Sequence, residues 1–132
     1  MHKSISIFML SILVTMSLAC GLLGGGDSGI GNAGGNNGYN TKFPLPANVS
    51  NFTDTGNGSI NFQTTMNVKD TIAFYRDAFG KEGLTERTIN TAITDTTFSL
   101  VFDGDPSGQA VVIQGVDLGN GKTNVNIRYE KV

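Results

Sequence analysis

Apolar residues recur with the spacing of one helical face in the middle of the chain. Asn67 precedes this pattern and can act as the N-cap, with Asp70 three residues later in the capping-box position. Gly83 follows Lys81 and supplies a C-terminal stop. The pattern therefore predicts a helix over about 68–82, whose buried face consists of Val68, Ile72, Tyr75 and Phe79, with Phe74 and Ala78 at its edge.

Alternation of apolar and polar residues, typical of strands with one buried face, dominates the sequence around this helix. The segment 84–94 is rich in Thr and is also β-like, whereas Asn51–Asn57 is typical of a turn, with room for a short strand around Val49–Phe52. Asn120-Gly121 is a strong hairpin signal. The clearest strands are Ser59–Thr64, Phe98–Phe102, Ala110–Val116 and Thr123–Tyr129, of which Ala110–Val116 is apolar on both faces, as in a central strand.

Taken together, these elements predict an α+β domain over residues 43–132, in the order β-α-β-β-β-β. We expect a single helix packed on a mainly antiparallel sheet of four to five strands. The prolines at 44 and 46 mark the entry into this domain, because proline favours extended backbone.

The N-terminus has a different pattern. Lys3 precedes Ile5–Leu18, an uncharged and mostly apolar run of 14 residues. As a helix this run is about 21 Å long, short of the roughly 30 Å core of a bilayer. It therefore predicts a signal peptide over residues 1–19.

Leu18-Ala19-Cys20 after this apolar run resembles the lipobox of bacterial lipoproteins. The resemblance implies cleavage before Cys20, lipidation of that residue, and a membrane anchor in the cell envelope with the domain outside the cytoplasm. It departs from the family pattern at Ser17, where Leu is preferred. An ordinary secretory cleavage site and an uncleaved anchor are the alternatives. The segment Ser59–Arg87 also resembles small, uncharacterised bacterial lipoproteins, and that resemblance brings no activity with it.

Residues 20–42 join the two parts. Nine of the 18 glycines lie between Gly21 and Gly38, together with several asparagines. Such a composition buries too little apolar surface to offset the entropy lost on ordering. We therefore expect a flexible tether that begins at the lipidated Cys20.

The composition limits the kinds of partner and reaction that we expect of this chain. The net charge of −2 argues against nucleic acid as a partner. His2 and Cys20 are the single residues of their kinds, and the expected cleavage and lipidation would remove both from use. Nucleophilic Ser-His-Asp or Cys-His sites and His-ligated zinc are then excluded, and we expect neither an enzyme nor a cofactor.

Two groups of residues remain as weak candidate sites. Asp103, Asp105 and Ser107 match the first half of a calcium-binding loop, although Gln114 occupies the position of the bidentate Glu and the same residues suit a β-turn. Asn124, Asn126 and Arg128 alternate with apolar residues and would point away from the helix.

These observations predict a lipid-anchored, non-enzymatic domain that binds an envelope protein or ligand. The alternatives are a small envelope enzyme or cation-binding domain that uses carboxylates, and a structural spacer. A pocket with two close carboxylates would favour the enzyme, and an exposed apolar surface would favour partner binding.

Overall fold

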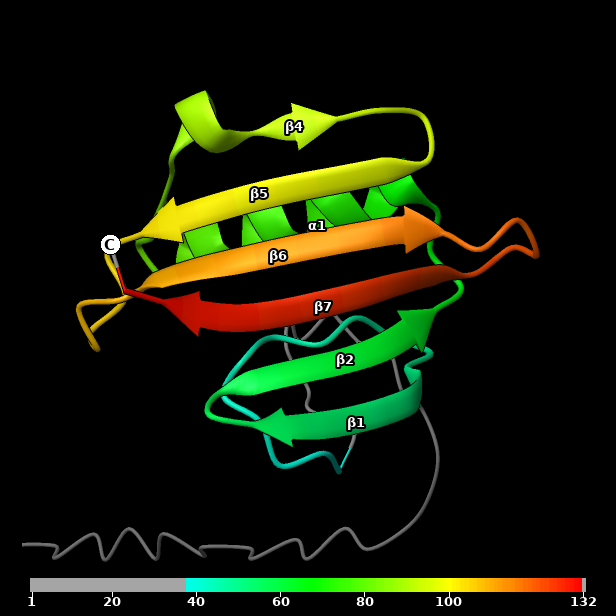
Figure 1. Ribbon diagram of the computed structural model, residues 1–132, viewed down its shortest axis with the longest axis horizontal. Coiled ribbons are helices and arrows are strands. Elements are labelled where there is room, and N and C mark those ends of the chain that lie inside the picture. Colours follow the sequence, from blue (N-terminus) through cyan, green and yellow to red (C-terminus); the bar gives the residue numbers. More distant parts are fainter. Residues whose placement is uncertain (1–37, 132) are drawn as a thin grey trace, which may run out of the picture.

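A computed structural model describes residues 38–131 as an α+β fold, in which the helix α1 lies against one face of an antiparallel sheet (Figure 1). The strands follow the spatial order β1-β2-β7-β6-β5-β3, and β4 also pairs with β5. The elements are β1 (Ser50–Gly56), β2 (Ser59–Thr64), α1 (Val68–Lys81), β3 (Thr85–Glu86), the 3₁₀ turn η1 (Thr88–Asn90), β4 (Ala92–Ile93), β5 (Thr97–Asp103), β6 (Ala110–Asp117) and β7 (Thr123–Glu130). The predicted signal peptide, Cys20 and most of the predicted tether lie outside the described residues.

The predicted fold class is confirmed, but the predicted number of strands is too low. The described residues form seven strands, of which β3 and β4 are two residues long. The prediction of a turn over Asn51–Asn57 is wrong, because β1 occupies most of this segment. Two irregularities in its pairing with β2 disturb the alternation of side chains, which explains why the pattern gave no clear strand.

Helix α1 begins and ends close to the predicted positions. The Asn67 side chain accepts a hydrogen bond from the Asp70 backbone N–H at 2.8 Å, and Glu82 forms the C-cap. Ile72, Tyr75 and Phe79 of the predicted face are buried against the sheet. Within residues 38–131, no helix is both long and apolar enough to span a bilayer.

The sheet edge beside α1 consists of β3, η1 and β4. Both strands pair antiparallel with β5, β3 at Phe102 and Asp103 and β4 at Phe98 and Ser99. They therefore run in the same direction along one side of β5, and η1 interrupts what would otherwise be one edge strand (Figure 1). The 84–94 segment is thus a broken strand.

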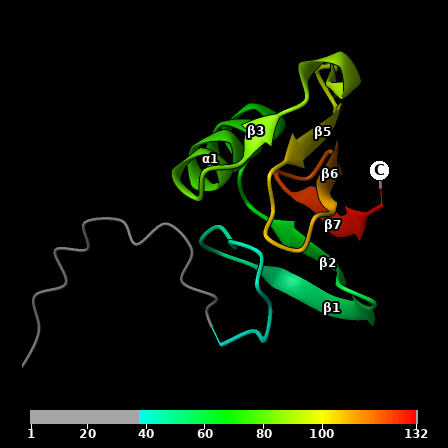
Figure 2. The same ribbon diagram turned by 90° about the vertical axis from the view of Figure 1, so that its left-hand side faces the viewer.

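The core lies between the sheet and the elements on one of its faces. Figure 2 shows α1 and the chain leading into β1 on the same side of the sheet. Phe43 packs on Tyr129 with ring centroids 4.8 Å apart, and Tyr39 stacks on Phe52 at 4.3 Å. The buried apolar residues of the sheet that face this core are Ile60, Phe62, Phe98, Leu100, Phe102, Val111, Ile113, Val125 and Ile127.

One glycine in the sheet is required by packing. Gly115 of β6 lies opposite Phe98 of β5, whose ring covers the glycine. A Cβ at position 115 would overlap the Phe98 ring. The missing side chain therefore lets a buried aromatic ring lie directly on the backbone of the neighbouring strand.

Candidate functional site

A groove of about 510 Å³ runs between α1 and the edge strand β4. The sheet edge is short here, so the space between helix and sheet stays open to solvent. The apolar side chains that line it are Val68, Ile72, Ala73 and Ile93, and the polar ones are Lys69, Arg76, Thr94 and Asp95.

Strand register explains why Ile93 lines the groove. It pairs with Phe98, and residues directly opposite each other in a sheet point to the same face. Phe98 is buried on the side of α1, so Ile93 points to that side too, yet it remains 47% exposed. Exposure of a large apolar residue at this position shows that α1 does not cover the edge completely.

The helix contributes a side chain small enough to leave that opening. Lys69, Ala73 and Arg76 follow one another at intervals of four and three residues and are all exposed. Ala73 stands at the centre of this row, opposite the sheet edge. A larger residue there would fill part of the groove.

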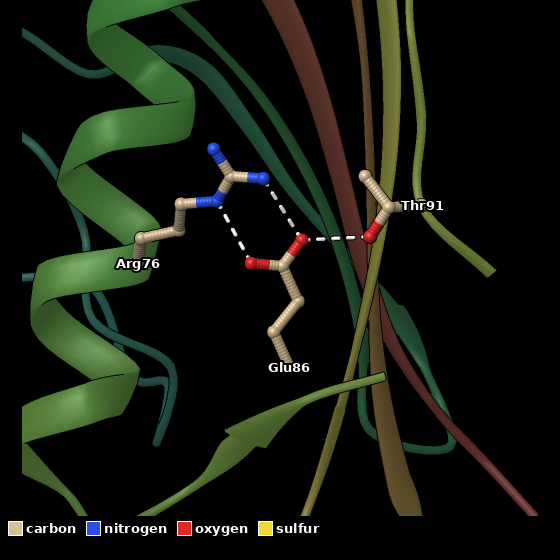
Figure 3. A network of polar contacts seen from close by, with 3 residues as sticks. All are labelled: Arg76, Glu86 and Thr91. Atoms are coloured by element: carbon tan, nitrogen blue, oxygen red, sulfur yellow. Dashed lines mark hydrogen bonds and ion pairs between the residues drawn. The ribbon is translucent and has the colours of Figure 1, made fainter. Parts of the chain in front are cut away.

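A polar network closes one end of the groove and joins three elements (Figure 3). Arg76 of α1 donates from Nε and Nη2 to the two carboxylate oxygens of Glu86 in β3, at 2.8 and 3.0 Å. The Thr91 hydroxyl, just before β4, donates to Glu86 Oε1 at 2.6 Å. Glu86 thus links α1 to both halves of the broken edge and helps to fix their separation.

The same contacts perturb the Glu86 carboxyl. The hydrogen bond from Arg76 lowers the pKa of Glu86, and the hydrogen bond from Thr91 and the charge of Arg76 add to this effect, against a smaller opposing effect of burial. Its side chain is only 16% exposed. The carboxylate therefore serves as a structural anchor in the charged form and is poorly suited to accept a proton.

The predicted binding residues lie on the opposite face of the sheet. Asn124, Asn126 and Arg128 of β7 are half-buried there, as their alternation indicated. Arg128 donates to Gln114 Oε1 at 2.8 Å and also contacts Asn126 and Glu130. A shallow depression of about 170 Å³ includes the two asparagines. The polar groups around Arg128 bond to one another, while Val116 opposite Asn124 is an exposed apolar residue of the same face.

The residues of the candidate calcium loop are occupied by other contacts. Asp103 forms a paired hydrogen bond with Arg87, through Nε at 2.8 Å and through Nη2. Asp105 accepts from the Ser107 backbone N–H at 2.8 Å, as in a tight turn. Across residues 38–131, no group of three or more His, Cys, Asp or Glu residues could hold a metal ion. The loop geometry is therefore that of a capped turn.

Two carboxylates approach each other at the C-terminal end of α1. Burial raises the pKa of Glu82, and the charge of Asp105 raises it further. The pKa of Tyr129 is also raised, first by burial and then by the charges of Asp105 and Glu82. None of these three residues lines the groove.

Comparison with known proteins adds no assignment, because no family model, curated protein or solved structure matches the chain. The described residues thus define a class by architecture: an α+β domain with a helix on an antiparallel sheet and an apolar groove at one sheet edge.

No local sequence pattern predicts this groove. Its lining comes from two segments, around positions 68–76 and 93–95, whose adjacency depends on the tertiary structure. The available signals were Ile93 in a polar, Thr-rich stretch, and Ala73 outside the apolar stripe of the helix.

Proposed function

We propose that the chain is a lipid-anchored, non-enzymatic binding domain of the cell envelope, and that the groove between α1 and β4 receives an apolar part of a protein partner. The observation that carries the proposal is the apolar lining of the groove, in which Ile93 and Ala73 are exposed and Ile72 and Val68 are nearly buried. When a complementary apolar group binds, it displaces water from such a surface, and the free energy of the system falls.

Exposed apolar residues support this choice of surface. Ile89 on η1 is 88% exposed and belongs to the same edge as Ile93. Large apolar side chains exposed close together are typical of interaction sites. The outer face around Asn126 and Arg128 offers mutually bonded polar groups instead, and a partner would have to replace those bonds to gain affinity there.

Polar residues around the groove would orient a partner. Lys69 and Asp95 bear opposite charges and flank the apolar lining. The Arg76–Glu86–Thr91 network holds one end of the groove in place even when no partner is bound. A largely pre-formed groove loses little entropy on binding.

A site-specific crosslinking experiment tests the groove. A photoreactive phenylalanine analogue at Lys69, an exposed residue at the flank of the groove, should form a discrete protein adduct in intact cells, and Ile93→Lys should abolish that adduct. The same analogue at Asp77, which is on the exposed side of α1 and paired with Lys81, is the matched control and should give none. Equal adducts from positions 69 and 77, or an adduct insensitive to Ile93→Lys, would refute the proposed site.

The anchor is tested separately. Cys20→Ala should release the protein from membranes, or leave it uncleaved at the size of its precursor. A mutant that still sediments with membranes at the size of the processed protein would show that Cys20 is not the anchor.

A further inference from the structure

The backbone of Ile93 is turned outward at the open edge of the sheet. The Thr94 N–H donates to the Thr97 carbonyl at 2.8 Å, so Thr94 and Thr97 form a hydrogen-bonded pair of the antiparallel ladder. Hydrogen-bonded and non-hydrogen-bonded pairs alternate, and Ile93 with Phe98 is therefore a non-hydrogen-bonded pair. The N–H and C=O of Ile93 point away from β5, and within the described residues no strand lies beyond β4.

This main-chain edge limits the chemistry of an occupant. A hydrocarbon chain could contact the apolar lining of the groove but would give the outward-pointing Ile93 N–H and C=O no hydrogen-bond partner. An extended polypeptide would supply one acceptor and one donor to these groups. The groove and the free edge together favour a peptide over a lipid.

On the basis of the proposed function, we propose that the groove binds one apolar side chain of an extended peptide segment whose backbone pairs with Ile93. The residue opposite Ile93 would exchange two hydrogen bonds with it and point to the same face, into the groove. Its two neighbours would point to the outer, polar face. The recognised segment therefore has one apolar residue flanked by polar ones.

The length of this pairing is restricted by η1. The Thr91 N–H already donates to the Thr88 carbonyl at 3.1 Å within the 3₁₀ turn, so the ladder does not continue past this point. The edge offers its free groups at Ile93 and not along a whole strand. Specificity then depends on the side chain that enters the groove, and continuous strand addition is prevented.

The test uses the full chain in lipid nanodiscs and a fluorescently labelled probe, the blocked peptide Ser-Thr-Leu-Thr-Ser. Fluorescence anisotropy gives its dissociation constant. The matched probe carries N-methyl-leucine, which removes the donor to the Ile93 carbonyl and keeps the side chain. We expect the dissociation constant of the methylated probe to be at least tenfold larger than that of the unmethylated probe. We expect a similar increase when Ser replaces the central Leu.

Two variants complete the design. Ala73→Leu narrows the groove and should weaken binding of the Leu probe at least tenfold, whereas Thr55→Leu on the distant strand β1 should leave it unchanged. Equal binding of the methylated and unmethylated probes, or no binding of the Leu probe at millimolar concentration, overturns the strand-pairing inference. A groove-specific adduct from position 69 in cells would still support the proposed function in that case, so the two failures are distinguishable.

Discussion

Tyr75→Phe tests the description of the core most directly, because it deletes one buried atom and keeps the ring. Tyr75 is fully buried, packs on Phe79 and Phe74, and its hydroxyl has no hydrogen-bond partner among residues 38–131. A buried polar group without a partner costs about 1–3 kcal/mol. We therefore expect Tyr75→Phe to increase the free energy of unfolding by about 1–3 kcal/mol, an unusual direction for a core substitution.

Thermal unfolding followed by circular dichroism measures this effect. For a domain of this size each kcal/mol shifts the melting temperature by about 4–8 °C, so the increase is well resolved. Tyr39→Phe is the matched control, because the half-buried Tyr39 ring stacks on Phe52 near the surface, and it should change stability by less than about 0.5 kcal/mol. Destabilisation by Tyr75→Phe would mean that the hydroxyl has a partner, and the reasoning would fail.

The same hydroxyl predicts a pH dependence. Burial raises the pKa of Tyr75 well above its ordinary value of 10.0. The unfolded protein therefore loses this proton at lower pH than the folded protein, and stability falls as the pH rises above about 10. Tyr75→Phe should show a smaller loss between about pH 10 and 11 than the wild type. Equal losses would contradict the burial of an ionisable group at this position.

The remaining predictions concern α1, β6 and the polar network. Phe79→Ala should cost about 3–5 kcal/mol in chemical denaturation, because it removes a buried ring, whereas Asp77→Ala should cost less than about 0.5 kcal/mol. Gly115→Ala should destabilise by about 1–3 kcal/mol by displacing Phe98, visible as a lower melting temperature. Because the pKa of Glu86 is lowered, its contribution is present above about pH 4.5 and lost as the pH falls through the folded-state pKa, and Glu86→Gln should remove this part of the acid sensitivity.

Each of these three predictions would be contradicted by a specific result. Similar losses for Phe79→Ala and Asp77→Ala would show that the buried face of α1 is assigned incorrectly. A melting temperature unchanged by Gly115→Ala would show that the aromatic ring can move away at little cost. Parallel acid-unfolding curves for the wild type and Glu86→Gln would show that the network does not contribute to stability.

Local signals predicted the parts of the fold that depend on neighbouring residues. Three such features can be predicted because each involves residues within one element: the Asn67 cap, the apolar stripe of α1 and the alternation in β7. The sheet edge could not be predicted from such local contacts. Whether 84–94 forms one strand or two depends on its pairing with β5, and η1 has no distinctive local pattern.

The candidate site was the least predictable part. Asn126 and Arg128 point to the predicted side, but the hydrogen bond from Arg128 to Gln114 could not be inferred, because it depends on the register of β6 with β7. The ion pair that occupies Asp103 depends likewise on the position of Arg87 across β3 and β5. Pairing across strands, which the sequence does not specify, decides which polar groups remain available to a ligand.

The irregular edge strand β1 bears on whether copies of the protein polymerise at high concentration. Asn51 lies in the strand with a left-handed backbone (φ 50°), and its side chain donates to Gln63 at 2.9 Å, which secures the irregularity. A neighbouring copy would find no flat, regular ladder to extend at this end of the sheet. Growth of a continuous intermolecular sheet is therefore obstructed at β1 by backbone shape and at the opposite edge by η1. A high protein concentration then need not lead to polymerisation.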